Sequence, residues 1–182
     1  MVNWKIICPS KYTCVLSRNN YRNSQKEINL VLWWDGYYIS PEQEAKLDIR
    51  EWTQDHALEG IQDRNGARSG ITLDRTEALL TINFLKTSIE SGLLRKQVDD
   101  KTDDQINEIL QSSKQELGRD SRKGTKFILL ICFKKVIKCD IRWWANYEPT
   151  KKGIRLNKNE ALKVIEYSEK ALENKMVWER EM

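Results

Sequence analysis

Residues 138–144, KCDIRWW, alternate polar and apolar side chains in the manner of a strand with one buried face. The polar side of this row carries Lys138, Asp140, Arg142 and Trp144. Lysine and arginine follow phosphates, and an open aromatic ring stacks on an unpaired base, so such a row is suited to binding a single-stranded nucleic acid. Two simpler interpretations stay open at this point: Asp140 pairs with its arginine, or the row is an ordinary solvated face.

Further basic and aromatic residues surround this row. Between positions 122 and 158, eleven basic residues stand against two acidic ones, in a chain whose formal net charge is only +4. A segment that is basic, aromatic and strand-like is a candidate surface for a polyanion. Its candidate contact residues are Phe133, Lys134, Lys135, Lys138, Arg142, Trp144, Lys151, Lys152 and Arg155. An earlier, similar segment adds Arg50, Trp52 and Arg68.

Patterns typical of catalysis and metal binding are missing. The single histidine, His56, and the four cysteines, none in a C-x-x-C pair, do not have the spacing of a zinc site. The glycine-rich phosphate-binding loops and the G-x-S-x-G turn of hydrolases are also absent. We therefore expect a binding protein rather than an enzyme, with no metal and no cofactor.

The row at 138–144 has a counterpart earlier in the chain. KLDIR at 46–50 matches KCDIR at 138–142, GITL at 70–73 matches GIRL at 153–156, and EAL at 77–79 matches EAL at 160–162. The connection between the first two matched segments is longer in the first copy, as expected for a surface loop. The sequence thus predicts an internal repeat.

Each copy is expected to contain strands followed by a helix. Apolar, β-branched runs precede both matched rows, at 27–34 and 126–133, and predict strands. Asp74 with Glu77, and Asn157 with Glu160, have the spacing of helix-capping boxes. Apolar residues at helical spacing then predict buried stripes. These stripes are Ala78, Leu79, Ile82, Leu85 and Ile89, and Ala161, Leu162, Ile165, Leu172 and Met176.

Three regions follow from this pattern. Residues 1–97 form the first strand–helix repeat and residues 122–182 the second. Residues 98–121 between them form an acidic linker with a short helix around 106–110. A further strand is expected near 4–9 or 12–17, whereas its counterpart near 114–120 has only a weak signal.

The tract FKKVIKCDIRWW, followed by a basic residue, G-I-x-L and an amphipathic helix, resembles the transcriptional coactivator p15 family, also called positive cofactor four. The resemblance implies a four-stranded curved antiparallel sheet followed by one helix, with two copies paired through their helices and single-stranded or melted DNA bound on the sheet. Phe133 and Lys134 match the family's hairpin tip, and Lys152 matches the lysine before its glycine. Arg142 and Arg50 match its strand arginine.

The first copy departs from this pattern. Ser69 replaces the lysine before the glycine, and the basic hairpin tip is missing. In both copies the family's tryptophan is also missing, since Thr53 and Ala145 stand at its position. The stacking role would therefore fall to neighbouring aromatic residues, and the first copy would bind more weakly.

Together these features predict an α+β protein in which two sheet–helix repeats form a whirly-like intramolecular pseudo-dimer with the helices packed between the sheets. Its expected function is binding single-stranded DNA with little sequence preference, in transcription regulation or in support of replication and repair. Single-stranded RNA binding and a protein-interaction scaffold with a basic face are the alternatives. Transcription or replication proteins and further copies of the chain are expected partners. No membrane is expected, and the expected location is intracellular, cytoplasmic or in the nucleoid of a bacterial or phage system.

Overall fold

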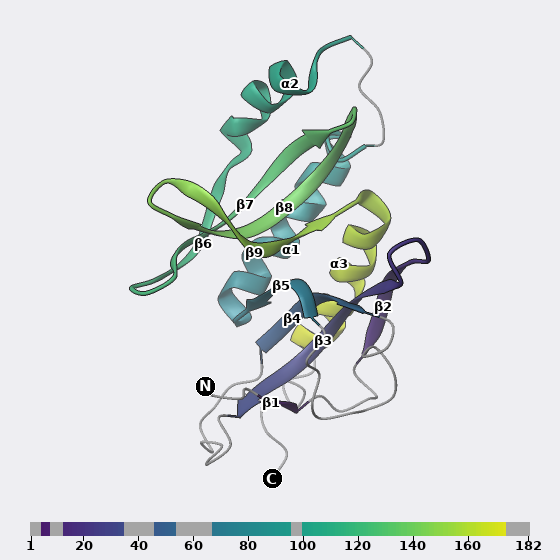
Figure 1. Ribbon diagram of the computed structural model, residues 1–182, viewed down its shortest axis with the longest axis vertical. Helices are drawn as coiled ribbons and strands as arrows, with labels where there is room; N and C mark the ends of the chain where they lie inside the picture. The colour runs from purple at the N-terminus through teal and green to yellow at the C-terminus, as the bar shows by residue number, and fades with distance from the viewer. Residues whose placement is uncertain (1–4, 8–12, 35–45, 54–66, 96–99, 174–182) are drawn as a thin grey trace. The chain divides into compact units, whose positions relative to one another are not determined.

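The computed structural model describes residues 5–7, 13–34, 46–53, 67–95 and 100–173 (Figure 1). Its first elements are β1 (Lys5–Ile7), β2 (Cys14–Asn19), β3 (Ser24–Trp34), β4 (Lys46–Thr53), β5 (Ala67–Leu73) and α1 (Arg75–Glu90). They are followed by α2 (Asp103–Leu110), the short 3-10 helix η3 (Gln111–Ser113), β6 (Gln115–Asp120), β7 (Gly124–Phe133), β8 (Val136–Ala145), β9 (Glu148–Leu156) and α3 (Lys158–Glu173).

The chain divides into two compact units. One comprises residues 1–78 with 166–182, and the other residues 79–165. The repeats expected from the sequence follow the chain, whereas each unit combines a sheet with part of α1 and part of α3. Each unit is described below by itself.

The sheet of the first unit is antiparallel and is built around β3. Strands β4 and β5 follow along one side of β3, while β2 and β1 pair with different stretches of its other side. Ile28, Ile49 and Ile71 lie opposite one another on β3, β4 and β5 and are at most 2% exposed. These isoleucines form the centre of the unit's core because β-branched side chains pack well on a pleated surface.

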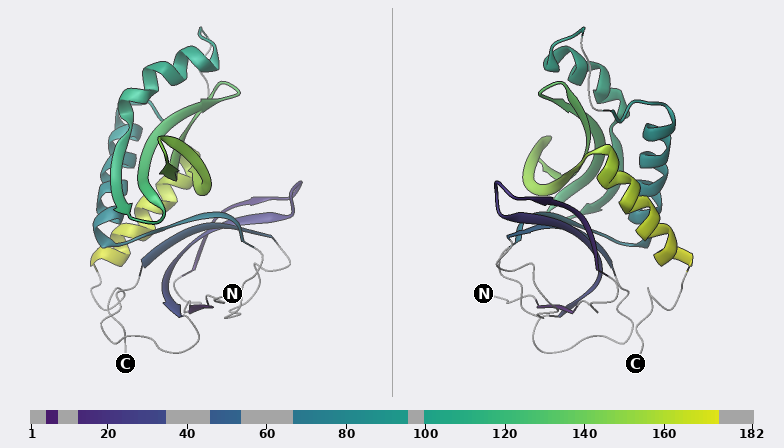
Figure 2. Two further views of the ribbon diagram at one scale, coloured as in Figure 1. Left: turned by 60° about the vertical axis from the view of Figure 1, so that its left-hand side comes forward. Right: turned by 90° about the vertical axis from the view of Figure 1, so that its right-hand side faces the viewer.

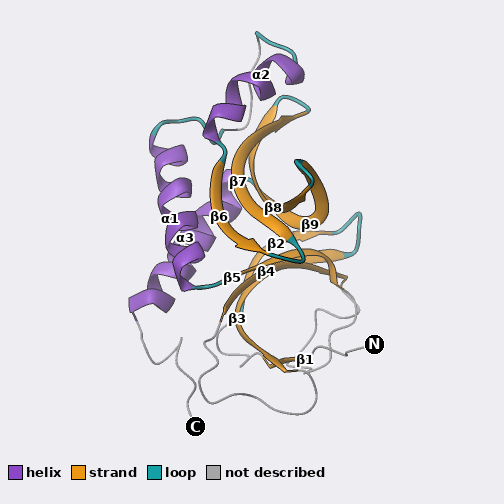
Figure 3. Cartoon of the chain, turned by 90° about the vertical axis from the view of Figure 1, so that its left-hand side faces the viewer, coloured by secondary structure: helices purple, strands orange, loops and turns teal. Residues whose placement is uncertain are grey.

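The sheet of the second unit has the order β6-β7-β8-β9 and is also antiparallel. Ile128, Ile141 and Ile154 occupy the positions of the three isoleucines above and are again at most 2% exposed. The sheet curls strongly, and the helical segments of this unit lie outside the curl (Figures 2 and 3). This arrangement confirms the α+β class and the predicted two repeats of sheet and helix.

The two repeats also share a β-bulge, which lies in β2 and in β6. In each sheet a bulge interrupts the pairing of this strand with the next, between Val15 and Ser17 in β2 and between Glu116 and Gly118 in β6. The residue at the bulge, Leu16 or Leu117, is buried. A bulge bends its strand and re-aims a side chain, which here is the leucine directed into the core.

Both long helices begin at the predicted capping boxes. The Glu77 amide donates to Asp74 Oδ1 at 2.8 Å, and the Asp74 amide donates to Glu77 Oε2 at 3.0 Å. Asn157 and Glu160 exchange the equivalent bonds at 2.9 and 3.0 Å. These reciprocal bonds satisfy amides that the first turn of a helix leaves unpaired, which is why both helices start directly after their strands.

The buried stripe of each helix differs from the predicted one by a single position. Leu79 and Leu162 are 47% and 46% exposed, although both were expected in the core. Ala78 and Ala161, one position earlier, are fully buried. The buried side of each helix therefore includes the alanine, and the leucine that follows it faces outward. Met176 lies outside the described residues.

The short helix expected near 106–110 is present as α2, and together with η3 it lies beside β7 (Figure 1). Ser113 Oγ accepts from the Leu130 amide at 3.1 Å. Asn107 accepts from the Cys132 amide at 2.6 Å and donates to the Cys132 carbonyl at 2.9 Å. β6 begins opposite Ile128, and these bonds continue the hydrogen bonding of the same β7 edge beyond that point.

Residues 115–120 form β6 and pair with β7, inside the segment that the sequence assigns to a linker. The composition QELGRD contains no β-branched or aromatic residue, so strand propensity alone gives little signal. Pairing with β7 decides the structure of this segment.

Two glycines lie opposite the repeated strand arginines, Gly70 opposite Arg50 and Gly153 opposite Arg142. A Cβ at Gly153 would lie 2.4 Å from Arg142 Cβ and 2.6 Å from the Ile141 carbonyl oxygen. At Gly70 the nearest atoms belong to the outer part of the Arg50 side chain, at 2.7 to 2.9 Å. The contacts at Gly70 are with side-chain atoms alone, although Arg50 is held by Asp48, whereas the contacts at Gly153 include the Ile141 backbone, which is fixed in the sheet.

Gly153→Ala is therefore expected to lower the free energy of unfolding by about 2 kcal/mol, the typical cost of overpacking. Gly70→Ala is the matched control and is expected to cost less than about 1 kcal/mol, since only a flexible side chain has to shift. Urea denaturation of the two variants measures the difference. Equal losses would mean that the two arginine–glycine contacts are equivalent.

Among the described residues, no helix combines the length and the apolar character needed to cross a membrane.

Candidate nucleic-acid interface

The alternation predicted for residues 138–144 is present in β8. Cys139 and Ile141 are fully buried on one face, while Lys138, Arg142 and Trp144 are half-buried on the other. We call the latter the polar face of the second sheet. By register it consists of Glu116, Arg119, Thr125, Phe127, Leu129, Ile131, Lys138, Asp140, Arg142, Trp144 and Arg155.

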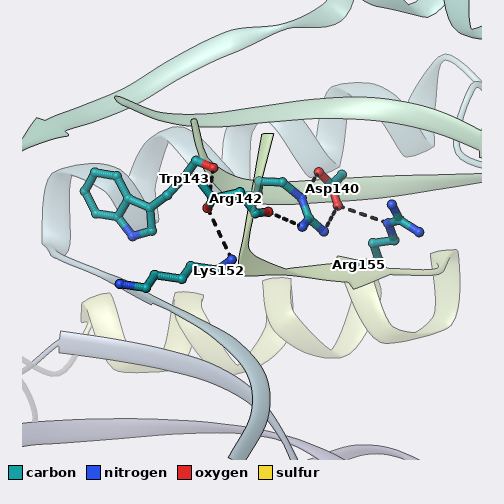
Figure 4. A network of polar contacts seen from close by, with 6 residues as sticks. Asp140, Arg142, Trp143, Lys152 and Arg155 are labelled. Carbon is teal, nitrogen blue, oxygen red and sulfur yellow. Dashed lines mark hydrogen bonds and ion pairs between the residues drawn. The ribbon is translucent and has the colours of Figure 1, made fainter. Parts of the chain in front are cut away.

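Asp140 organises the middle of this face (Figure 4). Its two carboxylate oxygens accept from Arg142 Nε at 2.7 Å and Nη2 at 2.8 Å, and Oδ1 also accepts from Arg155 Nε at 3.2 Å. The hydrogen bonds to Asp140 raise the pKa of Arg142. The expected pairing of aspartate and arginine is therefore real, and Arg142 is held rigidly rather than reaching outward.

A further hydrogen bond of Arg142 supports the conformation of the edge strand β9. Its Nη1 donates to the Thr150 carbonyl at 2.6 Å, and Thr150 Oγ1 donates to the Trp143 carbonyl at 2.8 Å. The β8–β9 register shifts between Arg142 and Trp144, so residues 150–152 form a bulge in β9. Both lysines of this bulge, Lys151 and Lys152, are exposed. Arg142 thus positions the bulge that presents two candidate phosphate-binding lysines.

Trp144 belongs to a small aromatic cluster at one end of the polar face. Its ring meets Phe127 edge-to-face, with centroids 5.8 Å apart. The Lys114 ammonium lies 3.5 Å from the Trp144 ring centroid and 4.1 Å from that of Phe127. Lys114 thereby occupies the indole face on which a base would stack, so a base stacking there has to displace the ammonium, which would then be near the phosphates.

The indole N–H of Trp144 is buried and has no hydrogen-bond partner among the described residues. Such an orphan donor costs free energy in the unbound protein. The ring is therefore held by packing against Phe127 and Lys114 and not by a hydrogen bond.

Phe133, Lys134 and Lys135 form the tip of the β7–β8 hairpin. Phe133 is 52% exposed, and the Lys134 ammonium lies 5.4 Å from its ring centroid. Both lysines have positive φ, 51° and 64°, as a two-residue hairpin turn requires. The strain of two non-glycine residues in this conformation makes external support of the turn important.

That support comes from Asp103 at the start of α2. Its carboxylate accepts from the Lys134 amide at 2.7 Å and from the Lys135 amide at 3.0 Å. The hydrogen bond from Lys135, together with that from Lys134, lowers the pKa of Asp103. The side chain of Lys135 donates to the Lys101 carbonyl, so Lys134 and Phe133 are the outward residues of the tip.

The first sheet repeats only part of this arrangement. Arg50 Nε and Nη2 donate to Asp48 at 3.0 and 2.8 Å, and Thr72 Oγ1, in the register position of Arg155, donates to Asp48 at 2.9 Å. Burial lowers the pKa of Arg50, but the charge of Asp48 and its hydrogen bonds outweigh burial and the net shift is upward. Arg50 is thus the structural equivalent of Arg142.

Trp52 was expected on an open face and is instead 1% exposed. Its neighbour on β3, Gln25, is also buried, so the first sheet buries this end of its polar face. Trp52 therefore offers no ring for stacking. Arg68 lies in β5, and its side chain is outside the described part of the structure.

The two polar faces also differ in their residues and in their charges. On β3 the positions of Phe127 and Leu129 are taken by Glu27 and Asn29, both buried. By register the face of the second sheet carries Lys138, Arg142, Arg155 and Arg119 against Asp140 and Glu116, and Arg119 pairs with Glu116. The face of the first carries Lys46, Arg50 and Arg18 against Glu27 and Asp48. Among the residues whose side chains are described, partly open aromatic rings lie on the second face and not on the first.

Several residues at the interface were not singled out from the sequence. Phe127 could have been found from the alternation of β7, which places it opposite Arg142. Lys114 could not be identified from the sequence. It lies in the segment assigned to an acidic linker, and it contacts Trp144 only because β6 pairs with β7. Lys123 and Lys126 lie within 5.8 and 4.6 Å of the Trp143 ring centroid, on the other side of β8.

No metal-binding cluster of three or more His, Cys, Asp or Glu residues occurs in the described ranges. The sequence matches no protein-family model and no curated protein.

Proposed function

We propose that this protein binds single-stranded DNA with little sequence preference, on the polar face of the second sheet, in transcription regulation or in support of replication and repair. The proposal extends to a place in the class of the p15 (positive cofactor four) coactivators, with a whirly-like pseudo-dimer made of the two repeats. The binding role is the part for which the second sheet supplies a direct physical argument.

One observation carries the proposal: the polar face of the second sheet holds partly open aromatic rings together with cations, whereas in the first sheet the equivalent tryptophan, Trp52, is buried. Trp144 and Phe127 share this face with Lys138 and Arg155, and Arg155, although paired with Asp140, keeps half of its side chain exposed. Phe133 with Lys134 adds an aromatic–basic pair at the hairpin tip. Stacking on aromatic rings and phosphate contacts from lysine and arginine are how sequence-tolerant single-strand sites work.

The geometry favours an unpaired strand over a duplex. Paired bases offer no free ring face for stacking, so the aromatic rings of the polar face suit unpaired bases. The aromatic–cation cluster of Trp144, Phe127 and Lys114 suits a single base with its phosphate. The hydrogen bonding of Arg142 to Asp140 and Thr150 leaves phosphate binding mainly to Lys134, Lys138, Lys151, Lys152 and Arg155.

The test is a fluorescence-anisotropy titration with single-stranded DNA, single-stranded RNA and duplex DNA of equal length. We expect single-stranded DNA to bind more tightly than duplex. The logarithm of its affinity should fall with the logarithm of salt by about 0.7 per phosphate neutralised. Equal affinity for duplex and single strand, or a flat salt response, would contradict the proposal. Tighter binding of RNA would reassign the ligand to RNA, because stacking and phosphate contacts do not distinguish the sugars.

A pair of equivalent lysines supplies the internal control. Lys138 and Lys46 occupy the same position of the repeat, in β8 and β4. Lys138→Ala should reduce the salt slope by about 0.7, the share of one phosphate, while Lys46→Ala should leave it unchanged.

A further inference from the structure

A second aromatic–basic cluster lies on the opposite side of β8 from Trp144. Trp143 follows Cys139 and Ile141 in the alternation of the strand, yet it is half-buried whereas they are fully buried. The Lys126 ammonium lies 4.6 Å from the Trp143 ring centroid and that of Lys123 lies 5.8 Å from it. A core tryptophan would be surrounded by apolar side chains, but this ring has the exposed Lys123 and the buried Lys126 as neighbours.

The position of Trp143 at the end of the sheet explains this environment. The β6–β7 turn, which contains Lys123, and the β8–β9 turn are at the same end of the sheet, because Asp120 pairs with Gly124 and Ala145 with Glu148. Tyr147, at the tip of the β8–β9 turn, is 98% exposed and has a φ of 65°. An exposed aromatic residue held in a conformation that favours glycine is an unusual choice for a simple turn.

The β9 bulge connects this cluster with the polar face. β9 is the edge strand of the sheet, and Lys151 and Lys152 lie on it opposite Trp143. In Figure 4 the Trp143 ring and the Lys152 ammonium extend to the same side of the network, and Arg155 lies on the other side of Asp140. Basic residues therefore run from Arg155 on the polar face, over the β9 edge, to the ring of Trp143.

We propose that Trp143, together with Lys123 and Tyr147, forms a second base-stacking subsite, which a single strand bound on the polar face reaches by turning around the β9 edge at Lys151 and Lys152. This inference rests on the proposed function and adds the path of the strand to it. In the first repeat Glu51, hydrogen-bonded to Ser24 at 2.5 Å, takes the place of Trp143, so the described residues there offer no equivalent ring.

The subsite predicts that binding depends on strand length. Labelled oligothymidines of about 6 and about 16 nucleotides bracket the usual extent of single-strand sites. The polar face alone accommodates the shorter strand, whereas the longer strand also reaches Trp143. Trp143→Ala should therefore weaken binding of the longer strand by about tenfold or more, as loss of one base–aromatic stack typically does, and affect the shorter strand little. Trp143→Phe should restore most of the loss.

Lys123→Ala, at an exposed position, should reduce the salt slope for the longer strand alone, by about 0.7. Tyr21→Ala is the matched control, since Tyr21 is a 98% exposed aromatic residue in a turn of the first sheet and should leave both affinities unchanged. Photo-cross-linking of the unaltered protein to the longer strand, mapped by mass spectrometry, keeps the test valid if Trp143→Ala does not fold. An adduct at Trp143 or Tyr147 is expected.

Failure of this inference differs from failure of the proposed function. If the unaltered protein binds both strands but Trp143→Ala binds the longer one equally well, or no adduct forms at Trp143 or Tyr147, the second subsite does not exist. If the unaltered protein binds neither strand, the proposed function itself is wrong.

Discussion

Arg142→Ala is expected to lower the free energy of unfolding by about 3 kcal/mol, the lower end of the cost of breaking a buried ion pair. Asp140 has a side chain only 5% exposed and would keep only Arg155 as an ion-pair partner. Binding of single-stranded DNA should weaken as well, because the Thr150 carbonyl loses its bond to Arg142 and the bulge carrying Lys151 and Lys152 loses its support. Urea denaturation and anisotropy titration measure the two effects separately.

Arg50→Ala is the matched control for this variant. Arg50 makes the same bidentate pair with Asp48, which is fully buried, so a comparable loss of stability is expected. Its binding of single-stranded DNA should be close to that of the unaltered protein, since the tryptophan of this face, Trp52, is buried and offers no ring for stacking. Equal loss of binding in the two variants would mean that both sheets bind the strand, or that destabilisation alone explains the effect.

Trp144→Ala is expected to weaken binding of single-stranded DNA by about 1 to 3 kcal/mol, the usual value of one base–aromatic stack. The half-buried ring also packs on Phe127 and under Lys114, so some loss of stability will accompany the loss of affinity. The sequence alone suggested that folding would be unaffected, because it placed the ring on a fully open face. Titration should be done at a temperature where denaturation curves show the variant to be folded.

Trp144→Phe separates stacking from packing. It keeps an aromatic ring against Phe127 and removes the buried indole N–H, whose lack of a partner costs about 1 to 3 kcal/mol. We therefore expect little change in stability, because the cavity left by the smaller ring offsets that gain, and only a modest loss of affinity. A phenylalanine variant that binds as weakly as the alanine variant would argue against stacking at this position.

The parts of the fold that depend on local pattern could be predicted from the sequence. The repeat, the alternation of KCDIR and KLDIR, and both helix starts follow from spacing along the chain, since the periods of strands and capping boxes are fixed by backbone geometry. The pairing of Asp140 with Arg142 was open to the same reasoning, because side chains two residues apart on a strand lie on one face.

Contacts between strands could not be predicted from local pattern. Strand β6 has little propensity of its own and forms because β7 offers a partner, and its pairing brings Lys114 over Trp144. Leu79 and Leu162 were expected in the buried stripes but are exposed, because apolar spacing alone does not tell how wide the buried side of a helix is.

The sequence by itself determined that two related sheet–helix repeats exist and that basic and aromatic residues concentrate in the second. Only the tertiary structure decided which aromatic rings remain open. Trp52 and Trp144 occupy the same position of the repeat, but Trp52 lies beside buried Gln25 and is enclosed, while Trp144 packs on Phe127 and stays half-exposed. The physical reason is that alternation fixes the face on which a side chain lies, whereas its burial depends on the residues that the neighbouring strands bring against it.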